Sequence, residues 1–212
     1  MSGLIGLVFF FGVSAGIVVV AVVLGRRQAE KAKENLAALA GELGLQLEEK
    51  PPVLGFIPRV TAVAGPHRGR TVHIHSYTTG SGKHRQTWRA VAISCDNPHG
   101  LILQLGTQNF LTALGVKFGM QDVKVGDAGF DERFVLKTSD PEFVRAALLP
   151  EIRTGLLANW STRAMGANVR LEARQLLYSE LGSFSDPTVT ARMKALLEPL
   201  YGLAAVAEVY RR

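Results

Sequence analysis

His73 and His75 have the residue type and spacing that come closest to a site for chemistry. They stand two residues apart in "VHIHS", and residues two apart on a β-strand point to the same face of the sheet. Two imidazoles placed in this way can bind zinc or copper when a third ligand joins them. The alternative is that both histidines are polar residues on the solvated face of a half-buried sheet.

The glycine-rich stretch "YTTGSGKHR" (77–85) invites comparison with a phosphate-binding loop. A Walker A loop needs G-x-x-x-x-G-K-[ST], but here Tyr77 stands in place of the first glycine and His84 in place of the hydroxyl residue. Such a loop also delivers phosphate to a helix N-terminus, whereas "RQTWRAVAIS" after it is typical of a strand. We therefore predict the tip of a β-hairpin in place of a nucleotide site.

Four basic residues in and before this hairpin are candidates for contact with an anionic surface. They are Arg68, Arg70, Lys83 and Arg85, and they could meet lipid headgroups, an acidic protein partner or a phosphate-bearing ligand. The chain carries a formal net charge of +6, all of it in residues 26–212. The basic residues are dispersed and lack interleaved aromatic residues, so we find no specific signal for nucleic-acid binding.

Carboxylates gather in "GDAGFDERF" at Asp127, Asp131 and Glu132. Paired carboxylates can act as acid and base or hold a cation, although the spacing is not that of an EF-hand loop. The alternative is a turn in which Phe130 and Phe134 anchor the segment to the core while Asp131 bonds the backbone.

The single cysteine, Cys95, follows an apolar strand and is expected to be a small buried hydrophobic residue that forms no intramolecular disulfide. The one G-x-S-x-G match in the sequence, GVSAG at 12–16, lies inside the apolar run of residues 3–24 and not at a strand-to-helix turn, so it does not indicate a nucleophile elbow. We therefore name no catalytic residue and no cofactor. Whether the protein is an enzyme stays open, and the sequence favours a protein that is not.

Residues 3–24 form an apolar run without a charged side chain. As a helix they would extend about 33 Å, close to the thickness of the bilayer core. A cleaved signal peptide would need a basic segment before a shorter apolar core, and only Met1 and Ser2 precede this run. Arg26, Arg27 and two lysines follow it, so the positive-inside rule predicts a single-pass inner-membrane protein with a cytoplasmic C-terminal domain.

Gly12 and Gly16 lie within this run at the spacing that lets two membrane helices approach closely. The lipid bilayer is thus the first expected partner of the chain, through residues 3–24. Self-association of the helix through these two glycines, giving a homodimer, is a second expectation.

We predict three parts: a transmembrane anchor at 1–25, a juxtamembrane helix or stalk at 26–44, and a soluble α+β domain at 45–212. Leucines recur at helical spacing in the stalk, and Gly44 is a plausible helix end. Short alternating segments between residues 53 and 138 favour an antiparallel sheet, with a short helix expected at 109–114. Helices are expected to begin at Pro141, Pro150 and Pro187.

Residues 168–182 are ambiguous between helix and strand. Val169 and Leu171 alternate with Arg170 and Glu172, which favours a strand or hairpin, whereas the adjacent leucines at 176 and 177 would also suit a helix. We favour the hairpin.

Several segments are similar to those of bacterial membrane-anchored proteins of uncharacterised function. The segments are "GRTV" (69–72), "GDAGFDERFVLKTSDP" (126–141), "LLPEIR" (148–153) and "YSELG" (178–182). The resemblance implies one N-terminal membrane helix followed by a cytoplasmic α+β domain, and it implies no catalytic residues.

From these features we expect a membrane-anchored, non-catalytic interaction or scaffold protein. Its cytoplasmic domain would bind a protein partner or the anionic membrane surface. The alternative is a membrane-tethered metal-binding module or enzyme that uses His73, His75 and the turn at Asp127 and Asp131.

Overall fold

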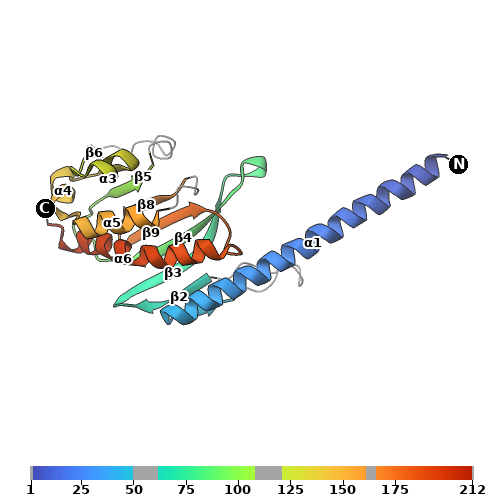
Figure 1. Cartoon of the computed structure of the whole chain (residues 1–212), viewed down its shortest axis with the longest axis horizontal. Helices are drawn as coiled ribbons and strands as arrows, with labels where there is room; N and C mark the ends of the chain where they lie inside the picture. The colour runs from blue at the N-terminus through green and yellow to red at the C-terminus, as the bar shows by residue number, and fades with distance from the viewer. Residues whose placement is uncertain (1, 50–61, 108–120, 161–165, 212) are drawn as a thin grey trace.

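The computed structural model describes residues 2–49, 62–107, 121–160 and 166–211, and it describes side chains from Val20 onward except those of Ala21 and Glu172. The chain is an α+β protein with a large antiparallel sheet and a long C-terminal helix, as the sequence predicts (Figure 1). The described helices are α1 (Ser2–Leu43), α3 (Ala128–Arg133), α4 (Pro141–Ala147), α5 (Pro150–Asn159) and α6 (Pro187–Val209), with a 3-10 turn, η1, at Gly82–His84.

Within the described residues, nine strands form one sheet in the order β1-β2-β3-β4-β9-β8-β5-β7-β6. Their bounds are β1 Gln46–Glu48, β2 Ala62–His67, β3 Arg70–Thr79, β4 Gln86–Ser94, β5 Leu103–Gly106, β6 Gln121–Val123, β7 Val135–Thr138, β8 Asn168–Glu172 and β9 Gln175–Leu181. Every pairing is antiparallel. The β8–β9 hairpin confirms the strand assignment of 168–182.

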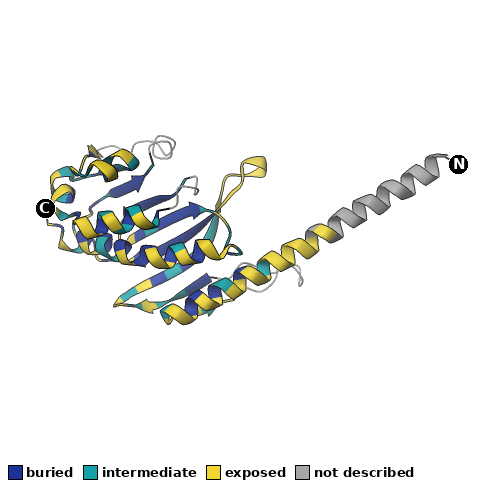
Figure 2. Cartoon of the chain, in the orientation of Figure 1, coloured by how far each residue is buried: buried dark blue, intermediate teal, exposed yellow. Residues whose placement is uncertain are grey.

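The two faces of this sheet differ in character. One face carries buried aliphatic residues such as Val72, Ile74 and Val91, and α1, α5 and α6 pack against it to form the core (Figure 2). Since strand side chains alternate, the residues between them point to the opposite face, among them His73 and His75. The core is thus a helical layer on a single sheet.

Capping residues place the helix starts where the sequence predicts them. Asp140 accepts a hydrogen bond from Phe143 N at 3.0 Å and begins α4, and Asp186 accepts one from Thr188 N at 2.9 Å and begins α6. Each of these helices, and α5 as well, has proline at its first turn. The three predicted helix starts are confirmed.

Helix α1 is continuous from Ser2 to Leu43 and is followed by Gly44, whose φ of 67° lies in the left-handed region that glycine adopts readily. Its last turns are part of the core, with Leu36 fully buried and Leu39 and Ala40 nearly so. The segment predicted as a stalk therefore packs on the domain along its second half.

Among the described residues, no helix combines the length and apolar character needed to cross a bilayer. The structure thus does not support the transmembrane helix expected at 3–24, and the expectation rests on the sequence. Most side chains of that segment, and the surroundings of Gly12 and Gly16, lie outside the described residues. The short helix expected at 109–114 also lies outside them.

Candidate functional site

A row of rings follows β3 on the face of the sheet opposite the helices. The rings of His73 and His75 stack with their centroids 4.4 Å apart, and that of Tyr77 lies 6.1 Å from His75. Trp88 of β4 continues the row at 6.3 Å from Tyr77. The predicted common face of the two histidines is confirmed by this stacking.

A shallow groove of about 310 Å³ lies beside this row. It is lined by His75, Tyr77, Arg170, Gln175 and Leu177. Strand β4 lies between β3 on one side of the groove and β9 on the other. Its Ala90 pairs with His75 of β3, and its Ala92 pairs with Leu177 of β9. Because alanine offers only a methyl group, the sheet surface is low between its taller neighbours. The groove therefore combines ring faces, one aliphatic side chain and one guanidinium.

The histidines do not meet the acidic turn. Glu48 is the carboxylate near them, with its Oε2 3.6 Å from His73 Nε2. The turn with Asp127 and Asp131 precedes β7, which stands five places from β3 in the sheet, or about 24 Å at the usual strand spacing. Over the described ranges, no three His, Cys, Asp or Glu side chains come together in a way that could hold a metal ion.

The acidic turn uses its carboxylates to hold its own backbone. Asp127 caps α3 by accepting from Phe130 N at 3.1 Å. Asp131 accepts from Val125 N and Gly126 N, each at 3.0 Å. Phe130 is buried in the core, so the turn is anchored as the structural alternative predicts.

The four predicted basic contacts fall into two separate pairs. Arg68 and Arg70 lie at the β2–β3 turn, where they form ion pairs with Glu198 and Glu208 of α6. Lys83 and Arg85 lie at the other end of β3, whose ten residues extend about 33 Å. The four residues therefore do not form one anion site.

The basic residues of the domain are mostly engaged within the protein. Among described residues, those with a side-chain ion pair or hydrogen bond to a neighbour are Lys33, Arg68, Arg70, Arg89, Lys124, Arg133, Lys137, Arg145, Arg153, Arg170, Arg174, Arg192, Lys194 and Arg211. Arg26 also has a partner. Within the same ranges, the cations without one are Arg27 and Lys31 of α1 and Lys83 and Arg85 of the hairpin tip.

One polar cluster was missed by reasoning from the sequence. Glu180 of β9 is fully buried, accepts two hydrogen bonds of 2.9 Å from Arg192 of α6, and also accepts one from the Tyr178 hydroxyl. Burial, together with the neighbouring carboxylate, raises the pKa of Tyr178 well above its ordinary value. The cluster fastens α6 to the sheet.

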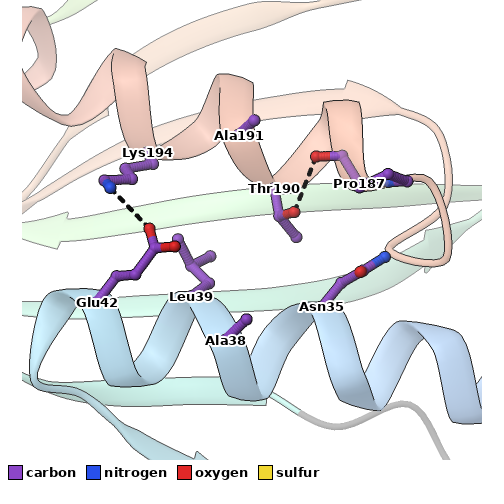
Figure 3. Close-up of a pocket in the computed structure, with 8 residues that line it drawn as sticks. All are labelled: Asn35, Ala38, Leu39, Glu42, Pro187, Thr190, Ala191 and Lys194. Carbon is purple, nitrogen blue, oxygen red and sulfur yellow. Dashed lines mark hydrogen bonds and ion pairs between the residues drawn. The ribbon is translucent and has the colours of Figure 1, made fainter.

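A second hollow, of about 420 Å³, lies between α1 and α6 (Figure 3). Lys194 of α6 reaches across it to Glu42 of α1 at 2.7 Å. Asn35 of α1 donates to the carbonyl oxygen of Phe184, just before α6, at 2.8 Å. These two contacts join α1 to α6 and to the segment just before it, and we call this contact region the seam between α1 and α6.

Cys95 is buried, as predicted, and burial raises the pKa of its thiol to about 11. A thiol with this pKa is protonated at neutral pH and is therefore a poor nucleophile.

Comparisons with known proteins assign no family to the chain, since no protein-family model matches the sequence and no match is found among curated proteins. The family resemblance therefore stays a prediction.

Proposed function

We propose that the protein is a single-pass, membrane-anchored and non-catalytic interaction protein with its α+β domain on the cytoplasmic side of the inner membrane. The span at 3–24 is proposed from the sequence, through its length, its lack of charge and the basic residues that follow it. The observation that carries the proposal is the continuity of α1 from Ser2 into the core. An anchor built in this way would hold the domain at a fixed place beside the bilayer.

The anchor is tested by membrane fractionation of the full chain. We expect the protein to stay in the membrane after washing at alkaline pH. The variant Val13→Lys, Ile17→Lys should leave it, because a lysine near the centre of a span costs about 3 kcal/mol. The matched control places lysine at two exposed apolar positions of the domain, Leu149 and Val209, and should remain in the membrane. Release of the unaltered chain by the alkaline wash would refute the anchor.

The cytoplasmic side is tested by labelling a Ser81→Cys variant with a maleimide that does not cross membranes. Ser81 is exposed at the hairpin tip, whereas the native Cys95 is buried and should react little. We expect labelling after cell lysis and none in intact cells whose outer membrane has been permeabilised. Labelling of those intact cells would place the domain on the other side.

The protein partner is proposed to bind in the groove between β3 and β9. Ring faces, Leu177 and the Arg170 guanidinium offer apolar contact and hydrogen-bond donors side by side, a mixture common in protein interfaces. A photo-crosslinking residue at Gln175 should form a defined adduct in membranes, and Tyr77→Ala should abolish it. The same crosslinker at Ala146, exposed on α4, is the control. Identical adducts at both positions would contradict this location.

A further inference from the structure

The tip of the β3–β4 hairpin, residues 80–85, has no role in the proposed partner groove, yet its shape is closely defined. All six residues are exposed. His84 N donates to Ser81 O at 3.1 Å and Arg85 N to Gly82 O at 3.3 Å, which closes the η1 turn. Gly80 has a φ of 73°, and a side chain there would collide with the His84 carbonyl. The turn thus presents Lys83, His84 and Arg85 in succession.

The charge at this tip is not used within the described part of the protein. The side chains of Lys83 and Arg85 have no ion-pair or hydrogen-bond partner there, in contrast to the basic residues at the opposite end of the hairpin. Arg27 and Lys31, one helical turn apart on α1, share this property. The free cations of the described residues therefore lie in two places. One is α1 just past the apolar run, and the other is the hairpin tip.

The fold places these two groups on the same side of the domain. The tip projects away from the sheet toward the side to which the N-terminal half of α1 extends (Figure 1). Helix and sheet meet just after α1, where Gln46 pairs with Ala64 of β2, beside the pair that Gly65 forms with Val72 of β3. From there Arg27 lies about 27 Å back along α1, and Gly80 at the start of the tip lies eight residues beyond Val72, the partner of Gly65, or about 26 Å along the hairpin. Both groups thus lie at a similar distance from this junction.

We propose that the hairpin tip binds the anionic headgroups of the bilayer in which α1 is anchored, as a second membrane contact of the domain. This inference rests on the proposed function. Lys83 and Arg85 would pair with headgroup phosphates in the plane that Arg27 and Lys31 occupy. The tip carries no Phe, Tyr, Trp or aliphatic side chain, so the contact is electrostatic and lies at the surface of the bilayer. A single-stranded nucleic acid would be expected to need stacking residues there.

The size of the effect follows from the two charges. Each Lys or Arg near an anionic membrane surface strengthens binding about fivefold. The two residues together should therefore raise the equilibrium constant for binding of the tip to the membrane about thirtyfold. Salt at about 0.5 M shortens the screening length to roughly 4 Å and should remove most of this contribution.

The experiment uses the full chain reconstituted into vesicles, with a fluorophore on Ser81→Cys and an energy acceptor on a small fraction of lipid headgroups. We expect strong energy transfer in vesicles that contain phosphatidylglycerol, and weak transfer in pure phosphatidylcholine or at 0.5 M salt. Lys83→Ala, Arg85→Ala should lower the transfer in anionic vesicles to the level in neutral ones. The matched control, Arg145→Ala, Arg174→Ala, removes two charges from exposed positions away from the tip and should leave the transfer unchanged.

Two outcomes of this experiment would overturn the proposal, and two further results named below would do the same. One is transfer that does not depend on Lys83 and Arg85, and the other is an equal fall in the control variant. A chain that resists alkaline extraction while its tip stays far from the headgroups would support the anchor and refute the tip contact. A chain that is extracted, yet binds anionic vesicles through Lys83 and Arg85, would refute the anchor and support the tip contact. A tip that ignores anionic vesicles but binds RNA would also overturn it.

Discussion

Replacing Glu180 by alanine is the sharpest test of how the helical layer is fastened to the sheet. The Glu180 side chain has no exposed surface, and Arg192 opposite it is 22% exposed. Alanine would leave the guanidinium without its carboxylate and the Tyr178 hydroxyl without its acceptor. Loss of one partner from a buried pair costs about 3–5 kcal/mol. For a chain of 212 residues this corresponds to a melting temperature lower by about 6–20 °C.

The assay is thermal unfolding of the full chain in detergent, followed by tryptophan fluorescence. The control is Glu198→Ala, on the helix α6 that carries Arg192, which breaks the ion pair of Glu198 with Arg68. Those side chains are 74% and 61% exposed, so the expected cost is below about 1 kcal/mol. The double variant Glu180→Ala, Arg192→Met should lose less than the sum of the single costs, because neither buried charge is then left alone.

The result that would refute this reasoning is a Glu180→Ala variant within about 1 kcal/mol of the exposed control. Additive costs in the double variant would be equally damaging. Either outcome would mean that water or a rearranged side chain replaces the lost carboxylate, and that α6 is held to the sheet by apolar packing alone.

Three further predictions concern packing, pH and capping. Gly202→Ala should lower the free energy of unfolding by about 1–3 kcal/mol, because its methyl would lie 2.6 Å from Ile152 Cγ1; denaturant titration measures this. The hydrogen bond from Arg70 lowers the pKa of Glu208 below 4.5. The ionised Glu208 therefore stabilises the fold above pH 4.5, and this contribution is lost as the pH falls through the pKa of Glu208 in the folded protein. Glu208→Gln should thus flatten the acid side of a curve of stability against pH. Asp127→Ala removes a helix cap and should cost about 1 kcal/mol in the same titration, and no change would contradict the capping role.

Part of the sheet could be predicted because strands such as β3 and β8 alternate apolar and polar residues over five positions. Val169 and Leu171 point inward in β8 as their spacing indicates, and the same holds for Val72 and Ile74 in β3. Strands β1 and β6 escaped notice because three residues each are too short for a pattern to emerge. Their pairing is set by neighbours that are distant in the sequence.

Glu180 shows where pattern and residue type conflict. The period of two that runs through Leu176 and Tyr178 places Glu180 on the inward face, whereas a carboxylate is ordinarily expected at the surface. The pattern was the better guide. The partner that makes this burial tolerable, Arg192, lies on α6 and could not be paired with Glu180 from the sequence alone.

The same limit applies to the basic residues. Arg68 and Arg70 have the same residue type as Arg85, and their engagement depends on Glu198 and Glu208, which lie 130 and 138 residues further along the chain. Their sequence neighbours give no hint of this pairing. Sorting the basic residues into engaged and free therefore requires the fold.

The seam between α1 and α6 decides whether the tip and the anchor can act together. A flexible stalk would let the domain rotate, and the free cations would then meet the bilayer in no fixed arrangement. Here Leu36 and Leu39 are buried in the core. Asn35 donates a hydrogen bond to the Phe184 carbonyl just before α6, and Glu42 forms an ion pair with Lys194 of α6. Because α6 in turn packs on β4 and β9, the direction of α1 and that of the β3–β4 hairpin are set by one packed unit. Loosening the seam with Leu36→Ala, Leu39→Ala should therefore weaken headgroup contact at the tip even though every cation is retained.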